Sequence, residues 1–185
     1  MPSLPVGAQV LSYGASPNVF YALDEIHGVF YSSTDKGASW HVANGGLPKV
    51  DPSYQGSRAT AVTGAPGEAK AGDVWIASTK GLFRSTTYGA TWNQVDASSV
   101  TAASSVGFGK AAKGSHYPTV YLAGTVNGVT GLFRSTNAGA TWVQINDSLH
   151  QWGGIAVVAG DPRVFGRVYV GGYEGRGVIY GASKN

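Results

Sequence analysis

The chain has 185 residues, and its 12% of charged residues lies well below the roughly 25% usual in soluble domains. Together with 28 glycines, this composition suits short strands and tight turns. Because there is no cysteine, disulfides, thiolate metal sites and thiol catalysis are excluded. The net charge is +3, but the 13 lysines and arginines are scattered singly, so we expect no nucleic-acid partner. No apolar run reaches the roughly 18 residues of a membrane helix, so we expect no membrane partner either.

Residues 8–50 contain a pattern that organises the whole chain. Apolar, β-branched or aromatic runs occupy residues 9–13, 19–22 and 28–32, and Ser, Pro and Asn separate the first two runs. Residues 33–40, Ser-Thr-Asp-Lys-Gly-Ala-Ser-Trp, fit the pattern Ser/Thr-X-Asp-X-Gly-X-Thr/Ser-Trp, which is known as the Asp-box. A fourth short strand is expected after it.

The same order of elements recurs along the chain. The Asp-box segments end at Trp40, Trp92 and Trp142, and a period of about 50 residues indicates a repeat architecture. We align the second strands of the units on residues 19–22, 74–77, 120–123 and 168–171. The fourth unit has its first three strands, the third at residues 177–180, and no Asp-box or fourth strand follows within the sequence.

Four short antiparallel strands in about 50 residues are typical of one blade of a β-propeller. We therefore predict an all-β chain, residues 1–185 being a single partial propeller domain of about four Asp-box-type blades, the last of them incomplete. The predicted blades occupy approximately residues 8–50, 57–98, 103–147 and 153–185. A β-sandwich is the main alternative. Four blades is the smallest ring that propellers usually form, and residues 4–10 could close such a ring by adding a strand to the last blade. We expect instead that the chain is part of a seven-bladed ring.

The Asp-box is predicted to be a folding device and not a catalytic site. The position of Asp35 is taken by Thr87 and Asn137 in the next two units, and short polar side chains of all three kinds stabilise turns by bonding nearby backbone N–H groups. The glycines are expected to adopt positive φ, and the tryptophans to pack inward.

Particular residues give a family resemblance across essentially the whole chain. The segments are residues 28–40, residues 44–48 (Asn-Gly-Gly-Leu-Pro), residues 150–153 (His-Gln-Trp-Gly), residues 160–171 and residues 175–181 (Gly-Arg-Gly-Val-Ile-Tyr-Gly). They resemble the C-terminal part of the second propeller of a glycoside hydrolase family 74 xyloglucanase.

The resemblance implies a propeller portion of a xyloglucan-hydrolysing endo-β-1,4-glucanase, forming one wall of a polysaccharide cleft in plant cell-wall degradation. Members of the family have two seven-bladed propellers and an inverting pair of catalytic aspartates. One aspartate lies near the start of each propeller, so we expect no catalytic residue in this chain. The implied partners are xyloglucan or a related β-1,4-glucan and the remaining blades of the parent enzyme. No cofactor and no metal are expected.

The parent protein is expected to be secreted, because its substrate is too large to enter a cell. Residues 1–5 do not read as a signal peptide, so a signal is expected to lie upstream or to have been removed. A non-catalytic binding or interaction module remains the alternative function. A sialidase-like enzyme is disfavoured because Arg84 and Arg134 lie within repeated strands, where they cannot form a triad of arginines on one face.

Substrate contacts are expected on loops of the face opposite the Asp-box turns, since loops on one face of a rigid scaffold commonly carry function. Sugar recognition needs flat aromatic faces flanked by polar side chains. The loop carboxylates, Asp24 and Asp147 among them, are interpreted as solvated surface charge. No cluster of histidine and carboxylate at metal-binding spacing is expected, since the four histidines lie singly. The predicted substrate-binding residues are Trp152, Tyr54, Tyr173, His150, Gln151, Arg58 and Arg176.

Overall fold

The computed structural model describes residues 4, 9–11, 18–24, 27, 29–43, 47, 58–61, 72–150, 154–172 and 177–182. All regular structure in these residues is β-strand, arranged in four antiparallel sheets. The described residues contain no helix of a length and apolarity that would cross a membrane.

The sheets follow one another along the sequence, and in each one the strands are hydrogen-bonded in chain order. The first sheet consists of β1 (Gln9–Leu11), β2 (Phe20–Asp24), β3 (Val29–Ser33) and β4 (His41–Val42). The second consists of β5 (Arg58–Ala61), β6 (Val74–Ser78), β7 (Gly81–Ser85) and β8 (Asn93–Gln94). The third consists of β9 (Val100–Gly109), β10 (Thr119–Val126), β11 (Val129–Ser135) and β12 (Val143–Gln144). The fourth consists of β13 (Ile155–Gly160), β14 (Val168–Gly172) and β15 (Val178–Gly181).

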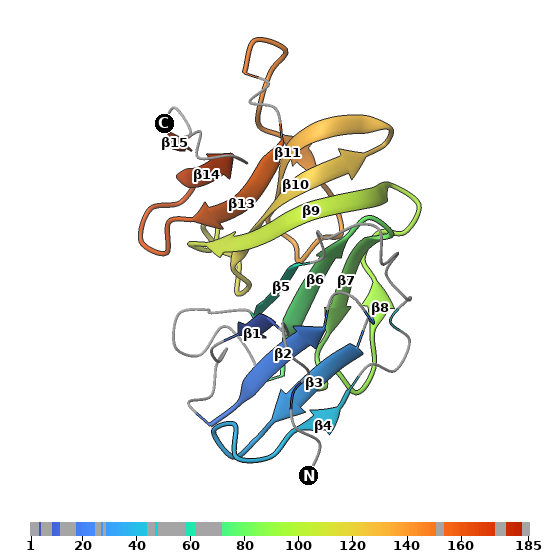
Figure 1. The fold of residues 1–185 in the computed structure, drawn as a ribbon. Helices are drawn as coiled ribbons and strands as arrows, with labels where there is room; N and C mark the ends of the chain where they lie inside the picture. Colours follow the sequence, from blue (N-terminus) through green and yellow to red (C-terminus); the bar gives the residue numbers. More distant parts are fainter. Residues whose placement is uncertain are drawn as a thin grey trace.

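Neighbouring sheets pack face to face. Strand β2 contacts β5, β6 contacts β9, and β9 contacts β13, so the four sheets lie in chain order from the first to the fourth. Figure 1 shows this succession, with the blue first sheet at one end and the red fourth sheet at the other. The predicted all-β fold with repeated antiparallel blades is confirmed, and the fourth sheet has three strands among the described residues.

Each pair of neighbouring sheets encloses its own hydrophobic core. Side chains alternate between the two faces of a strand, so one strand can supply two cores. In β6, Val74 and Ile76 belong to the core shared with the first sheet, whereas Trp75 and Ala77 belong to the core shared with the third. All five residues of β6 are therefore buried. Tyr169 of β14 has the place of Trp75, but it is 37% exposed because no described sheet follows the fourth.

The strand registers correct the predicted alignment of the second strands. Phe20 pairs with Ser33, as Val74 pairs with Ser85 and Val120 with Ser135. Phe20, and not Val19, is therefore equivalent to Val74, so the alignment that started at residue 19 was wrong by one residue. The corrected register gives every blade an aromatic residue at the same position of its second strand, namely Tyr21, Trp75, Tyr121 and Tyr169. In the first three blades this residue packs toward the following sheet.

Candidate functional site

The antiparallel strand order places the connections between strands on two opposite faces of the molecule. The Asp-box turns, at residues 34–40, 86–92 and 136–142, share one face with the β9–β10 and β13–β14 connections. We call this the Asp-box face. The β2–β3, β6–β7 and β10–β11 turns and the segments that follow β8 and β12 lie at the other strand ends, and we call this the opposite face.

In the first blade the Asp-box turn is held by one serine and one aspartate. Ser33 Oγ accepts the N–H of Gly37 at 2.8 Å and donates to Asp35 Oδ1 at 2.7 Å. Asp35 also accepts the N–H of Ser39 at 2.8 Å and its hydroxyl at 2.6 Å. These bonds, the Ser39 hydroxyl foremost, lower the pKa of Asp35 to about 2. The carboxylate is thus occupied in the turn and is ionised at neutral pH, which suits a structural role.

The next two blades build the same turn from other side chains. Thr87 Oγ1 accepts the N–H of Thr91 at 3.0 Å, and Asn137 Oδ1 accepts that of Thr141 at 3.0 Å. In both turns a serine hydroxyl accepts the glycine N–H at 2.9 Å. A carboxylate is therefore dispensable at this position, which supports the structural interpretation of the motif.

A polar cluster on the Asp-box face joins the second and third blades. Asp73, 4% exposed, forms a two-point ion pair with Arg84, at 3.0 Å to Nε and 2.7 Å to Nη2. Its carboxylate also accepts the hydroxyl of Tyr117 at 2.8 Å and the indole N–H of Trp75 at 3.1 Å. The guanidinium of Arg84 lies over the ring of Tyr117, 4.7 Å from its centroid.

The same arginine contact recurs between the third and fourth blades. Arg134 lies 5.3 Å from the ring centroid of Phe165, and Phe165 has the sequence position that Tyr117 has one repeat earlier. Arg84 and Arg134 are thus engaged in contacts between blades. Neither is held ready for a substrate carboxylate, consistent with the expectation against a sialidase-like site.

His150, on the opposite face, is the one predicted site residue whose side chain is described. It follows β12, and its Nδ1 lies 2.6 Å from Asp147 Oδ1; the side chains are 60% and 63% exposed. Asp147 Oδ1 also accepts the backbone N–H groups of Leu149 and His150, both at 2.9 Å. The hydrogen bond from His150 is the main cause that keeps the pKa of Asp147 below its ordinary value.

The other predicted site residues are described in part or not at all. Of Arg58, the structure describes the backbone at the start of β5. The predicted residues Trp152, Tyr54, Tyr173, Gln151 and Arg176 lie outside the described residues.

Asn146 anchors this short loop to the third sheet. Its Oδ1 accepts the N–H of Leu132 in β11 at 2.7 Å, and its Nδ2 donates to the carbonyl of His150 at 3.3 Å. Leu149 is 89% exposed. The loop therefore presents an apolar side chain, an imidazole and a carboxylate on an ordered backbone.

A second aspartate–histidine pair lies on the same face. His27 Nδ1 is 2.6 Å from Asp24 Oδ2, and the N–H of His27 donates to Asp24 Oδ1 at 3.1 Å. The interpretation of Asp24 as solvated surface charge was wrong, because Asp24 is only 6% exposed. Both pairs share the spacing Asp-X-X-His, at residues 24–27 and 147–150, and this spacing is the signal that the sequence offers for them.

No group of three or more His, Asp or Glu side chains with metal-binding geometry occurs in the described part of the chain. The described opposite face offers hydrogen-bonding groups at Asp147 and His150 and an apolar side chain at Leu149.

The repeated sheets and their turns define a partial Asp-box β-propeller. No protein-family model matches the chain. A xyloglucanase of a Paenibacillus species is 39% identical over 184 residues, covering 96% of this chain and 17% of that protein. Xyloglucanase Xgh74A of Acetivibrio thermocellus is 41% identical over 180 residues, covering 97% of this chain and 20% of that protein. The crystal structure of a family 74 glycoside hydrolase from Niastella koreensis superposes with a TM-score of 0.78 at 39% identity, covering 94% of this chain and 24% of that one.

The resemblance to family 74 xyloglucanases is therefore confirmed. The chain is homologous to one segment of these enzymes, and it spans 17–20% of the length of the two curated relatives described.

Proposed function

We propose that the chain forms one wall of the polysaccharide cleft of a secreted, xyloglucan-hydrolysing enzyme. The observation that carries the proposal is the 39–41% identity to xyloglucanases over nearly the whole chain. Its opposite face supplies the wall, and the glucan is the partner that the relatives' names imply.

The chemistry of the described opposite face supports binding and not catalysis. An inverting glycosidase needs one carboxyl with a raised pKa to donate a proton and a second to activate water. Asp147 has a lowered pKa, and Asp24 is buried against His27. Neither is prepared to act as the general acid. We place the catalytic pair in other parts of the parent enzyme.

The loop at residues 146–150 is the described part of the proposed sugar contact. Exposed Leu149 offers an apolar surface to a sugar ring, and His150 offers a ring nitrogen to a hydroxyl. Trp152, two residues beyond, adds the flat aromatic surface that stacking requires. Tyr54, Tyr173, Gln151, Arg58 and Arg176 complete the proposed set.

The test is binding of a xyloglucan oligosaccharide to the purified chain, measured by calorimetry together with reducing-sugar release. We expect saturable binding, no hydrolysis, and at least tenfold weaker binding for Trp152→Ala. His150→Ala should weaken binding, whereas the control His41→Ala, an exposed histidine of β4, should not. Hydrolysis by the chain alone, or unchanged binding by Trp152→Ala, would refute the proposal.

A further inference from the structure

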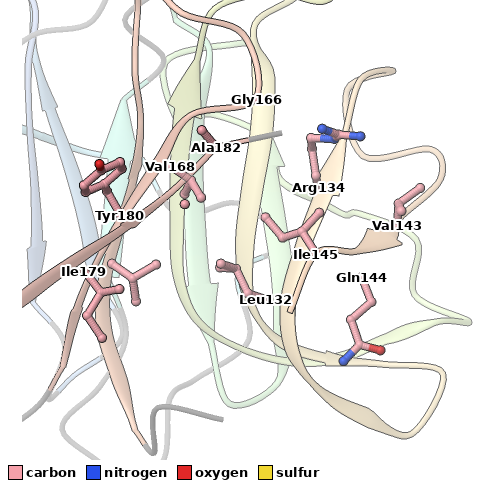
Figure 2. Close-up of a pocket in the computed structure, with 12 residues that line it drawn as sticks. Leu132, Arg134, Val143, Gln144, Ile145, Gly166, Val168, Ile179, Tyr180 and Ala182 are labelled. Atoms are coloured by element: carbon pink, nitrogen blue, oxygen red, sulfur yellow. The ribbon is translucent and has the colours of Figure 1, made fainter. Parts of the chain in front are cut away.

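A cavity opens between the third and fourth sheets. It has a volume of about 310 Å³ and is lined chiefly by apolar side chains and glycine. Figure 2 shows Leu132 and Ile145 on one side of it and Ile179 and Tyr180 on the other. In the equivalent spaces between the earlier sheets, a side chain of the Asp-box motif occupies this position.

Between the first and second sheets this space is filled by an Asp-box tryptophan. The indole of Trp92 meets the ring of Phe30 edge-on at 4.9 Å between centroids, and its Nε1 donates to the carbonyl of Ala43 at 3.1 Å. Between the second and third sheets, Trp142 packs against the hydrophobic core that contains Leu82. Val95 packs against the same core.

The backbone shows that the third sheet repeats this receiving site. Ala43 donates its N–H to Phe30 at 2.8 Å, Val95 donates to Leu82 at 2.7 Å, and Ile145 donates to Leu132 at 2.8 Å. Leu132 and Ile145 therefore stand where Phe30 and Ala43 hold Trp92, and both line the cavity. No described tryptophan occupies this third position.

The edge of β15 is a second indication, because the equivalent strands of the earlier sheets pair there with a short fourth strand. In the second sheet the short strand β8 pairs with Phe83 and Arg84 of β7. In the third sheet β12 pairs with Phe133 and Arg134 of β11. By register, Ile179 and Tyr180 are the equivalents of Phe133 and Arg134. Within the described residues β15 pairs with β14 alone, and Ile179 and Tyr180 are 40% and 68% exposed.

From these equivalences we infer that the cavity and the edge of β15 together bind an Asp-box-type β-strand that lies outside the described residues. Its tryptophan fills the space against Leu132 and Ile145, and its backbone pairs with Ile179 and Tyr180. This surface is separate from the proposed glucan wall, so its test does not depend on sugar binding.

A graft tests the inference directly. Residues 181–185 are replaced by the sequence of residues 135–145, so that the Asp-box and short strand of the third sheet follow Tyr180 in register; the control graft has alanine for its tryptophan. We expect the tryptophan graft to unfold about 4–10 °C above the alanine graft, since burying an indole contributes a few kcal/mol and a chain of this size gains several degrees from it. Ile145→Ala should remove at least half of this difference. Equal melting temperatures of the two grafts would overturn the inference.

A peptide added in trans covers the case in which the grafted chain does not fold. The peptide has the sequence of residues 135–145, and calorimetry measures its binding to the unmodified chain. Saturable binding that weakens at least tenfold when the peptide's tryptophan is replaced by alanine supports the inference. No binding at a peptide concentration of about 1 mM, which corresponds to roughly 4 kcal/mol, overturns it.

Discussion

Trp92 joins two blades, because its indole packs edge-on against Phe30 of the preceding blade and donates its Nε1 proton to the carbonyl of Ala43. Trp92 is 6% exposed, whereas the equivalent Trp40 of the first blade is only partly buried. The same motif residue thus has different surroundings in different repeats, which makes matched comparisons possible.

Trp92→Ala should cost about 3–5 kcal/mol of unfolding free energy, as expected for removal of a large aromatic side chain from a core. Trp40→Ala should cost clearly less, because no described blade precedes the first. Urea unfolding followed by circular dichroism measures both. Equal losses would show that Trp92 does not join the blades in solution.

The Asp-box glycines offer a second matched pair. Gly37 and Gly89 both have positive φ, at 88° and 86°, so alanine should cost about 1–2 kcal/mol at either position. A Cβ at Gly89 would also approach the Phe30 ring and the carbonyl oxygen of Ala43 to 2.7 Å, whereas at Gly37 it would come no closer than 3.7 Å to Trp40. Gly89→Ala should therefore lose roughly a further 1–3 kcal/mol. Thermal unfolding of the two variants checks this, and a larger loss for Gly37→Ala would contradict it.

Asp35 should make a measurable acid-dependent contribution to stability. Its pKa is lowered to about 2 in the folded chain, foremost by the Ser39 hydroxyl, against roughly 3.9 when unfolded. The contribution is present above pH 4 and is lost as the pH falls toward 2. Asp35→Asn should keep the turn, as Asn137 does in the third blade, but lack this pH dependence. Urea unfolding at pH 5, 3.5 and 2.5 measures it; parallel curves for the two proteins would exclude the contribution.

The hydroxyl of Tyr117 should stabilise the contact between the second and third blades. It donates to Asp73 at 2.8 Å and accepts the indole N–H of Trp75 at 3.0 Å. Tyr117→Phe should cost about 1–3 kcal/mol, because it leaves buried polar atoms with fewer partners. Tyr180→Phe is the control, since its 68% exposed side chain should tolerate loss of the hydroxyl. Similar denaturation midpoints for Tyr117→Phe and the parent chain would show that the cluster adds no stability.

The sequence predicted the blades well because each repeat carries strong local signals: alternating apolar runs, a turn motif and a tryptophan. It misplaced the second strand of the first blade because Val19 and Phe20 are both apolar, and only pairing of Phe20 with Ser33 fixes the register. Asp73 could not be recognised, since its partners Arg84 and Tyr117 lie 11 and 44 residues away in sequence and meet through packing of the blades.

The candidate site was less predictable than the fold. Substrate contacts depend on loop conformations, which no periodic pattern specifies. The local Asp-X-X-His spacing at residues 147–150 was readable, but that it forms a hydrogen-bonded pair emerges only from the turn geometry around Asp147.

The proposed function requires that glucan binds the opposite face and leaves the Asp-box face free. The direct test is an NMR titration of the isotopically labelled chain with a xyloglucan oligosaccharide. Amide shifts should move for residues 96–99, 126–129 and 146–150 and stay unchanged for the Asp-box residues Asp35, Thr87 and Asn137. Perturbation confined to the Asp-box turns, or no perturbation at saturating oligosaccharide, would contradict glucan binding at the opposite face.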